Sequence, residues 1–180
     1  MFGFLLFSLG FANAQETQVS NTSSEAPMYI SGRSAVAVPA NANKDVVSHG
    51  GGVGVFLNDK NSMGLRVIYM ADPPDNPLAT STPEIPNAWG PVVDWQYYFQ
   101  PDRNFSFFTQ SSIGYVYGVP SNENEKNVIL PILEFGFGAR LSRKTSNGGR
   151  IYLSPELGFV PGAMAPYSAV SLGVVLPAKK

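Results

Sequence analysis

The chain has 180 residues, a formal net charge of −1, 14% charged residues and no cysteine. This length suits one domain, and the lack of a basic excess argues against a nucleic-acid partner. Disulfides, thiolate metal sites and a cysteine nucleophile are excluded. Because His49 is the only histidine, we also expect no metal site and no cofactor. The 18 glycines and 15 prolines favour extended segments with many turns over long helices.

The amino terminus has the pattern of an export signal. An apolar run over residues 1–11 ends in Ala12-Asn13-Ala14, which matches a small-residue cleavage site. We therefore expect a signal peptide over residues 1–14; a buried strand or helix is the alternative. Residues 15–27 are rich in Ser, Thr, Asn and Glu, so we expect a disordered leader there.

From Met28 onward, the chain consists of runs of about ten residues with period-two patterning and many aromatic or β-branched residues, which is typical of strands. No segment shows a sustained helical stripe. The pattern predicts one β-domain over residues 28–176, followed by a tail over residues 177–180. The eight predicted strands span residues 28–38, 46–57, 62–71, 88–99, 104–118, 127–141, 150–160 and 166–176.

The connections alternate in length. Those after the second, fourth and sixth predicted strands are tight turns at residues 58–61, 100–103 and 142–149, the last with an Asn-Gly pair. Those after the first, third and fifth tend to be longer, and residues 72–87 form a proline-rich extreme that we interpret as an exposed loop for surface contact. The last connection, at 161–165, is a short exception. This pattern predicts an up-and-down meander with its tight turns at one end.

The placement of charge indicates which face of the strands meets water. All six lysines fall in predicted connections or the tail, although a soluble barrel would need such residues on its outer strand faces. Charges inside strands share their face with small or polar neighbours, whereas the opposite face is apolar. We therefore place the charged face inside the barrel and the apolar face against lipid. These interior charges are Arg33, Arg66, Asp94, Glu134, Arg140 and Glu156.

Aromatic residues gather towards the ends of the strands, where the interface girdles of a membrane barrel would lie. The alternative is that they form the core of a soluble sheet protein. The residues assigned to the girdles are Trp89, Trp95, Tyr97, Phe99, Phe105, Tyr115, Tyr117, Phe159 and Tyr167.

Together, the export signal, the eight strands, the alternating connections and the interior charges resemble the small outer-membrane barrels of the OmpA, OmpX and OmpW kind. The likeness covers Met28 to Leu176 and lies in the pattern, without a diagnostic motif. It implies an all-β fold, an eight-stranded antiparallel up-and-down transmembrane β-barrel, located in the bacterial outer membrane. Its partners would be outer-membrane lipid, including lipopolysaccharide, and a small solute or a surface partner bound through the loops.

Three functions remain open at this point. The first is a non-enzymatic barrel closed by pairs among the interior charges, which serves envelope structure or surface interaction. The second, which the OmpW resemblance allows, is a narrow channel for small or apolar solutes. An apolar gate built from Phe56, Ile68, Tyr98 and Phe108 would favour it. The third is a soluble periplasmic lipocalin-like binder with its apolar face inside.

Enzymatic activity is not expected. Ser48 and His49 are the only hydroxyl–imidazole neighbours, and adjacent strand residues point to opposite faces, so they do not form a catalytic pair. The glycine-rich run at 50–54 lacks the following helix and the Lys-Ser/Thr pair of a phosphate loop. A bent, closely packed strand explains this run.

Overall fold

The computed structural model describes five stretches of the chain: residues 26–39, 45–71, 87–100, 104–120 and 127–177. The expected signal peptide, most of the leader, the proline-rich connection at 72–86 and the end of the tail lie outside the described residues. The strands of the expected barrel are all described.

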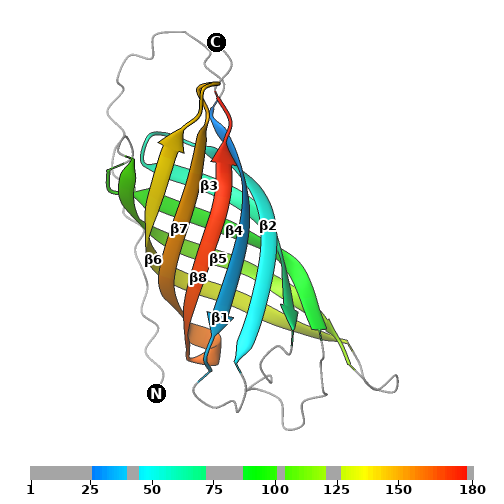
Figure 1. Ribbon diagram of the computed structural model, residues 1–180. Coiled ribbons are helices and arrows are strands. Elements are labelled where there is room, and N and C mark those ends of the chain that lie inside the picture. The colour runs from blue at the N-terminus through cyan, green and yellow to red at the C-terminus, as the bar shows by residue number, and fades with distance from the viewer. Residues whose placement is uncertain (1–25, 40–44, 72–86, 101–103, 121–126, 178–180) are drawn as a thin grey trace, which may run out of the picture.

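Eight strands follow one another along the chain, and a short 3-10 turn separates the last two (Figure 1). Predicted and observed strand ends agree within one residue, except at the end of β6. There the strand extends to Lys144, because backbone pairing with β7 continues beyond the apolar pattern that marked it. The elements are β1 (Met28–Ala37), β2 (Val46–Phe56), β3 (Asn61–Ala71), β4 (Asn87–Tyr98), β5 (Phe105–Val119), β6 (Val128–Lys144), β7 (Arg150–Val160), η1 (Pro161–Ala163) and β8 (Ala165–Val175).

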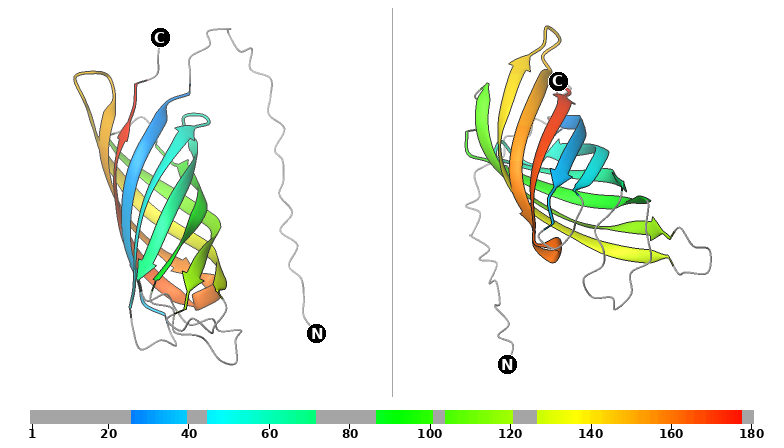
Figure 2. Two further views of the ribbon diagram at one scale, coloured as in Figure 1. Left: turned by 90° about the vertical axis from the view of Figure 1, so that its right-hand side faces the viewer. Right: turned by 60° about the horizontal axis from the view of Figure 1, so that its bottom comes forward.

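The sheet closes on itself. Each strand pairs antiparallel with its neighbours in sequence, and β1 also pairs with β8, where Tyr29 lies opposite Val175 and Ala37 opposite Tyr167. The predicted all-β, eight-stranded, antiparallel up-and-down barrel is therefore confirmed. Closure removes the sheet edges that would otherwise carry unpaired backbone groups. The strands are tilted in the barrel wall, as the two views in Figure 2 show.

The tight turns lie together at one end of the barrel, which is the upper end in Figure 1. Between β2 and β3, the Asn58 side chain accepts hydrogen bonds of 2.9 Å from the backbone N–H groups of Lys60 and Asn61. Between β6 and β7, Gly148 has a φ of 83°, which a residue with a β-carbon adopts only with strain. At the opposite end, η1 makes the short connection into β8.

The two faces of the barrel wall differ in chemistry. Outward positions carry large apolar side chains, such as Ile113, Leu157 and Leu172, which are 64%, 69% and 59% exposed. Among the outward positions of the eight strands, Arg143 is the single Asp, Glu, Lys or Arg, and it lies close to the end of β6. The predicted orientation, with the apolar face outside, is the one observed. No helix in the described residues is long and apolar enough to cross a membrane.

Candidate functional site in the barrel interior

The inward side chains form three layers along the barrel axis. Aromatic rings occupy the tight-turn end, ionised side chains occupy the middle, and aliphatic side chains occupy the end where the longer connections lie. The aliphatic layer consists of Val46, Ile68, Met70, Ala88, Val92, Val116, Leu130 and Ile132. All of these residues are buried, so this end of the lumen is filled by packed hydrocarbon.

Small residues make room for the large interior rings. A β-carbon added to Gly54 or Gly64 would overlap the ring or hydroxyl of Tyr29, and one added to Gly158 would overlap Tyr167. Gly54 belongs to the glycine-rich run of β2, which the structure shows as a continuous strand. The run therefore serves close packing inside a narrow barrel.

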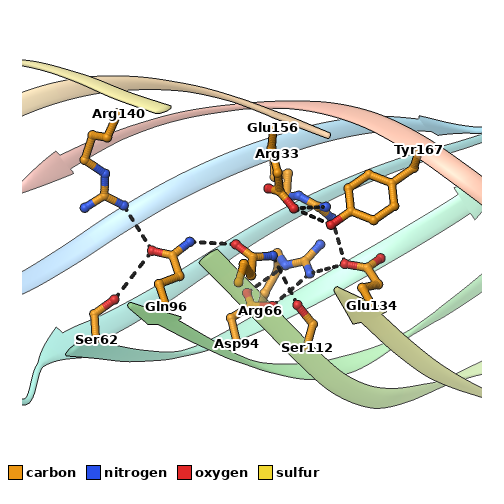
Figure 3. Close-up of polar contacts among 11 residues, drawn as sticks. Arg33, Ser62, Arg66, Asp94, Gln96, Ser112, Glu134, Arg140, Glu156 and Tyr167 are labelled. Atoms are coloured by element: carbon orange, nitrogen blue, oxygen red, sulfur yellow. Dashed lines mark hydrogen bonds and ion pairs between the residues drawn. The ribbon is translucent and has the colours of Figure 1, made fainter. Parts of the chain in front are cut away.

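The middle layer is an ion-pair cluster that spans the lumen (Figure 3). The guanidinium of Arg66 contacts Asp94 through two hydrogen bonds of 2.9 Å, from Nε to Oδ2 and from Nη2 to Oδ1. Its Nη2 also donates to Glu134 Oε2 at 3.2 Å. Arg33 donates from Nη1 to the same Glu134 oxygen at 3.1 Å, and from Nη2 to Glu156 Oε1 at 3.2 Å. Glu134 therefore joins the two arginines into one cluster that draws on five strands.

Burial makes these pairs depend on one another. Arg33, Arg66, Glu134 and Glu156 are each at most 5% exposed. A buried charge is costly without its partner, so the loss of one member would leave the others uncompensated. Tyr167 supports the cluster: its hydroxyl donates to Glu156, and its ring centroid lies 5.0 Å from the Arg33 guanidinium carbon.

Arg140 lies in the aromatic layer, apart from the ion-pair cluster. Its guanidinium carbon is 4.1 Å from the ring centroid of Tyr152 and 4.4 Å from that of Tyr98, close enough for cation–π contacts. Its hydrogen-bond partners are neutral: Nη2 donates to Gln96 Oε1 at 3.1 Å, and Nε donates to Ser154 Oγ at 3.4 Å. Within the described chain, no carboxylate lies at ion-pair distance from Arg140.

A chain of hydrogen-bonded polar side chains runs from Arg140 to Ser112. Gln96 accepts the hydrogen bond from Arg140 and donates from Nε2 to Gln110 Oε1 at 2.6 Å, and Gln110 donates to Ser112 at 3.1 Å. Figure 3 shows Gln96 between Arg140 and the ion-pair cluster. The interior polar groups therefore satisfy one another along much of the lumen.

The structure places all six sequence-selected charges inside the barrel, and it brings five of them together. Arg140 is the exception, because strand alternation gives the face of a residue but not its height along a tilted strand. The four residues of the hypothetical apolar gate also point inward. Phe56, Tyr98 and Phe108 belong to the aromatic layer, and Ile68 belongs to the aliphatic layer.

The assignment of Tyr167 to an interface girdle is wrong. Its side chain is 5% exposed and contacts Glu156 inside the barrel. The signal was present in the sequence, since Tyr167 shares its strand face with Ala169, Ser171 and Gly173, while Val170 and Leu172 occupy the other. Clustering near a strand end does not identify a girdle residue unless the residue also lies on the outer face.

Ser48 and His49 point to opposite faces, as expected. Ser48 is buried inside the barrel, and His49 lies on the outer face, where its Nδ1 is 3.0 Å from the Oγ of Ser34. No outward strand position in the described ranges carries a carboxylate that would complete a triad. The described residues also contain no group of three or more His, Cys, Asp or Glu side chains suited to a metal ion.

The fold and its layered interior define a small, closed, eight-stranded antiparallel barrel with an apolar outer wall. Comparison with solved structures confirms the resemblance to small eight-stranded outer-membrane barrels. Neisserial surface protein A aligns with a TM-score of 0.54 at 10% identity, over 83% of this chain and 95% of that one. The N-terminal β-barrel domain of Pseudomonas aeruginosa OprF aligns with a TM-score of 0.52 at 12% identity, over 82% of this chain and 97% of that one. No protein-family model and no curated protein matches the sequence.

Proposed function

We propose that this protein is a non-enzymatic integral protein of the bacterial outer membrane whose lumen is closed to steady ion flow. In this arrangement the tight turns face the periplasm and the longer connections face outward, as is usual for such barrels. The protein serves envelope structure, or it serves surface interaction through its loops. Outer-membrane lipid, including lipopolysaccharide, surrounds the apolar wall.

The ion-pair cluster is the observation that carries this proposal. Arg33, Arg66, Asp94, Glu134 and Glu156 come from five strands and meet across the middle of the lumen. An eight-stranded barrel is just wide enough for its side chains to fill the interior. Ion flow would require the separation of buried pairs that are held by hydrogen bonds, and this separation is costly. The aliphatic layer is a second obstruction to ion flow, at the end of the lumen that lies opposite the tight turns.

The apolar outer wall supports the membrane location. A soluble lipocalin-like binder would expose polar residues on the outside and keep an apolar interior. This barrel instead exposes large apolar residues such as Leu157 and Leu172, and its interior includes the buried charges Arg33 and Arg66. Arg or Lys facing lipid near the bilayer midplane costs about 2 to 4 kcal/mol, which explains why the outward strand positions avoid them.

A narrow channel for small or apolar solutes is the second candidate. The inward aromatic layer favours it, since Phe56, Tyr98 and Phe108 form a chain of ring contacts with centroid separations of 5.9 and 5.8 Å. Rotation of these rings would open only the tight-turn end of the lumen. The ion-pair cluster would still obstruct the path, so the closed barrel is the stronger proposal.

Gel mobility and cell fractionation test the membrane location. The protein is extracted with detergent and run boiled and unboiled, because a closed membrane barrel resists detergent until it is heated. We expect a mobility shift on boiling and recovery in the outer-membrane fraction. Recovery in the soluble periplasmic fraction without a shift would contradict the proposal.

A further inference from the structure

A vestibule opens at the tight-turn end of the barrel, beyond the aromatic layer. It has a volume of about 410 Å³ and lies between the β2–β3 turn, the segment before β1 and the β6–β7 hairpin. Figure 2 shows that this hairpin extends past the neighbouring strand ends. The walls combine aromatic and apolar surface with a few polar groups. The residues that matter here are Tyr98, Arg140, Ser142, Arg150 and Tyr152.

Arg140 forms the inner wall of this vestibule, and its charge is not neutralised by a carboxylate in the described chain. It is 7% exposed, so it has lost most of its contact with water. The rings of Tyr98 and Tyr152 stabilise it, and Gln96 and Ser154 accept hydrogen bonds from two of its nitrogens. In Figure 3, its other terminal nitrogen makes no drawn contact and points away from the ion-pair cluster.

The contrast with the other interior arginines is informative. Arg33 and Arg66 are equally buried, and each contacts two carboxylates. A buried cation with only neutral partners retains a strong preference for an anion. Arg140 meets this condition at the wall of a cavity, which gives an anion a place to bind.

The surroundings of the vestibule are also cationic. Arg150, at the start of β7, lines the same cavity, and Asp59 is the single carboxylate among its lining residues. Such an excess raises the local concentration of anions at the mouth. Charged residues of the described chain at this end comprise the cations Lys60, Arg140, Arg143, Lys144 and Arg150 and the anion Asp59.

We propose that the vestibule binds a small soluble anion, with a phosphate or carboxylate group attached to an apolar body. Arg140 anchors the anionic group, Arg150 provides a second positive charge, and the hydroxyl of Ser142 lines the same cavity as an additional donor. The apolar body packs against the rings of Tyr98 and Tyr152. This inference depends on the cavity and on Arg140, and it does not require that the barrel be closed to ions.

The test uses the full chain, folded in detergent, with phenyl phosphate as the probe and phenol and inorganic phosphate as comparisons. Binding is measured by calorimetric titration, with phosphorus NMR line broadening for the two phosphates. We expect phenyl phosphate to bind with a dissociation constant of about 1 mM or lower. Inorganic phosphate should bind more weakly, phenol should not bind, and added salt should weaken binding. Absence of phenyl phosphate binding would overturn the proposal.

Three variants locate the site. Arg140→Gln should weaken phenyl phosphate binding about tenfold or more, because it removes a charged donor inside the cavity. Arg150→Gln should weaken it less. Arg143→Gln is the matched control, because it removes a neighbouring positive charge that lies outside the cavity, and it should leave binding unchanged. Equal binding by wild type and Arg140→Gln would overturn the proposal.

Gel mobility before boiling reports whether each variant has folded. If Arg140→Gln does not fold, phenyl phosphate binding by Arg150→Gln is compared with binding by Arg143→Gln. Both residues lie near the rim of the vestibule, so this comparison tests whether the anion binds inside it. Weaker binding in Arg150→Gln alone supports the vestibule. An equal loss in both variants would show a diffuse attraction to the cationic end and would overturn it.

Discussion

The ion-pair cluster and the aromatic layer both bury arginine inside one narrow lumen, yet they stabilise it in different ways. Arg66 contacts Asp94 and Glu134 at 2.9 to 3.2 Å. The guanidinium carbon of Arg140 lies 4.1 and 4.4 Å from the ring centroids of Tyr152 and Tyr98, and its hydrogen-bond partners are neutral. The cluster is therefore a set of mutually dependent charges, two arginines and three carboxylates, whereas Arg140 in the aromatic layer is the residue that we propose binds an anion. The first arrangement suits a seal, and the second suits a binding site.

The largest expected effect comes from breaking the cluster. Arg66→Met should lower the free energy of unfolding by about 3 to 5 kcal/mol, because Asp94 and Glu134 lose a buried partner. Arg140→Met is the matched variant and should cost only about 1 to 2 kcal/mol, since it removes cation–π contacts without orphaning a carboxylate. Urea unfolding in lipid vesicles measures both values. Equal losses would show that the two regions do not differ as described.

A second prediction concerns the wall that encloses both regions. Ile113→Arg, at an outward position in the middle of β5, should lower the free energy of unfolding by about 2 to 4 kcal/mol in vesicles. Val119→Arg, at the loop end of the same strand, should cost about 0 to 1 kcal/mol, because the interface is more polar than the midplane. A cost that does not depend on depth would contradict the placement of the outer wall in lipid.

The smallest expected losses of stability come from removing one tyrosine hydroxyl in each region. Tyr167→Phe removes a donor to the carboxylate of Glu156 and should cost about 1.5 to 3 kcal/mol. Tyr98→Phe removes a donor to the neutral amide of Gln96 and should cost about 0.5 to 1.5 kcal/mol. The same unfolding assay applies, and the reverse order would argue against a charged centre beside a neutral aromatic layer.

The eight strands and their alternating connections predicted the barrel. The lysine positions indicated which strand face lies inside, and strand alternation assigned all six charges to that face. It could do so because neighbouring residues on a strand point to opposite sides, which is a local property of the backbone. The pairing of the charges is not local: Arg33 and Glu156 are separated by 123 positions. Tilt of the strands decides which inward residues reach the same height. Arg140 was therefore grouped with the paired charges although it lies in another layer.

The central claim is that the ion-pair cluster and the layers around it close the lumen. Planar-bilayer recording of the purified, folded protein tests this most directly. The structure predicts no large steady conductance, because ions would have to separate the buried pairs among Arg33, Arg66, Asp94, Glu134 and Glu156. A large, steady conductance from the wild-type protein would contradict the closed lumen and favour the channel.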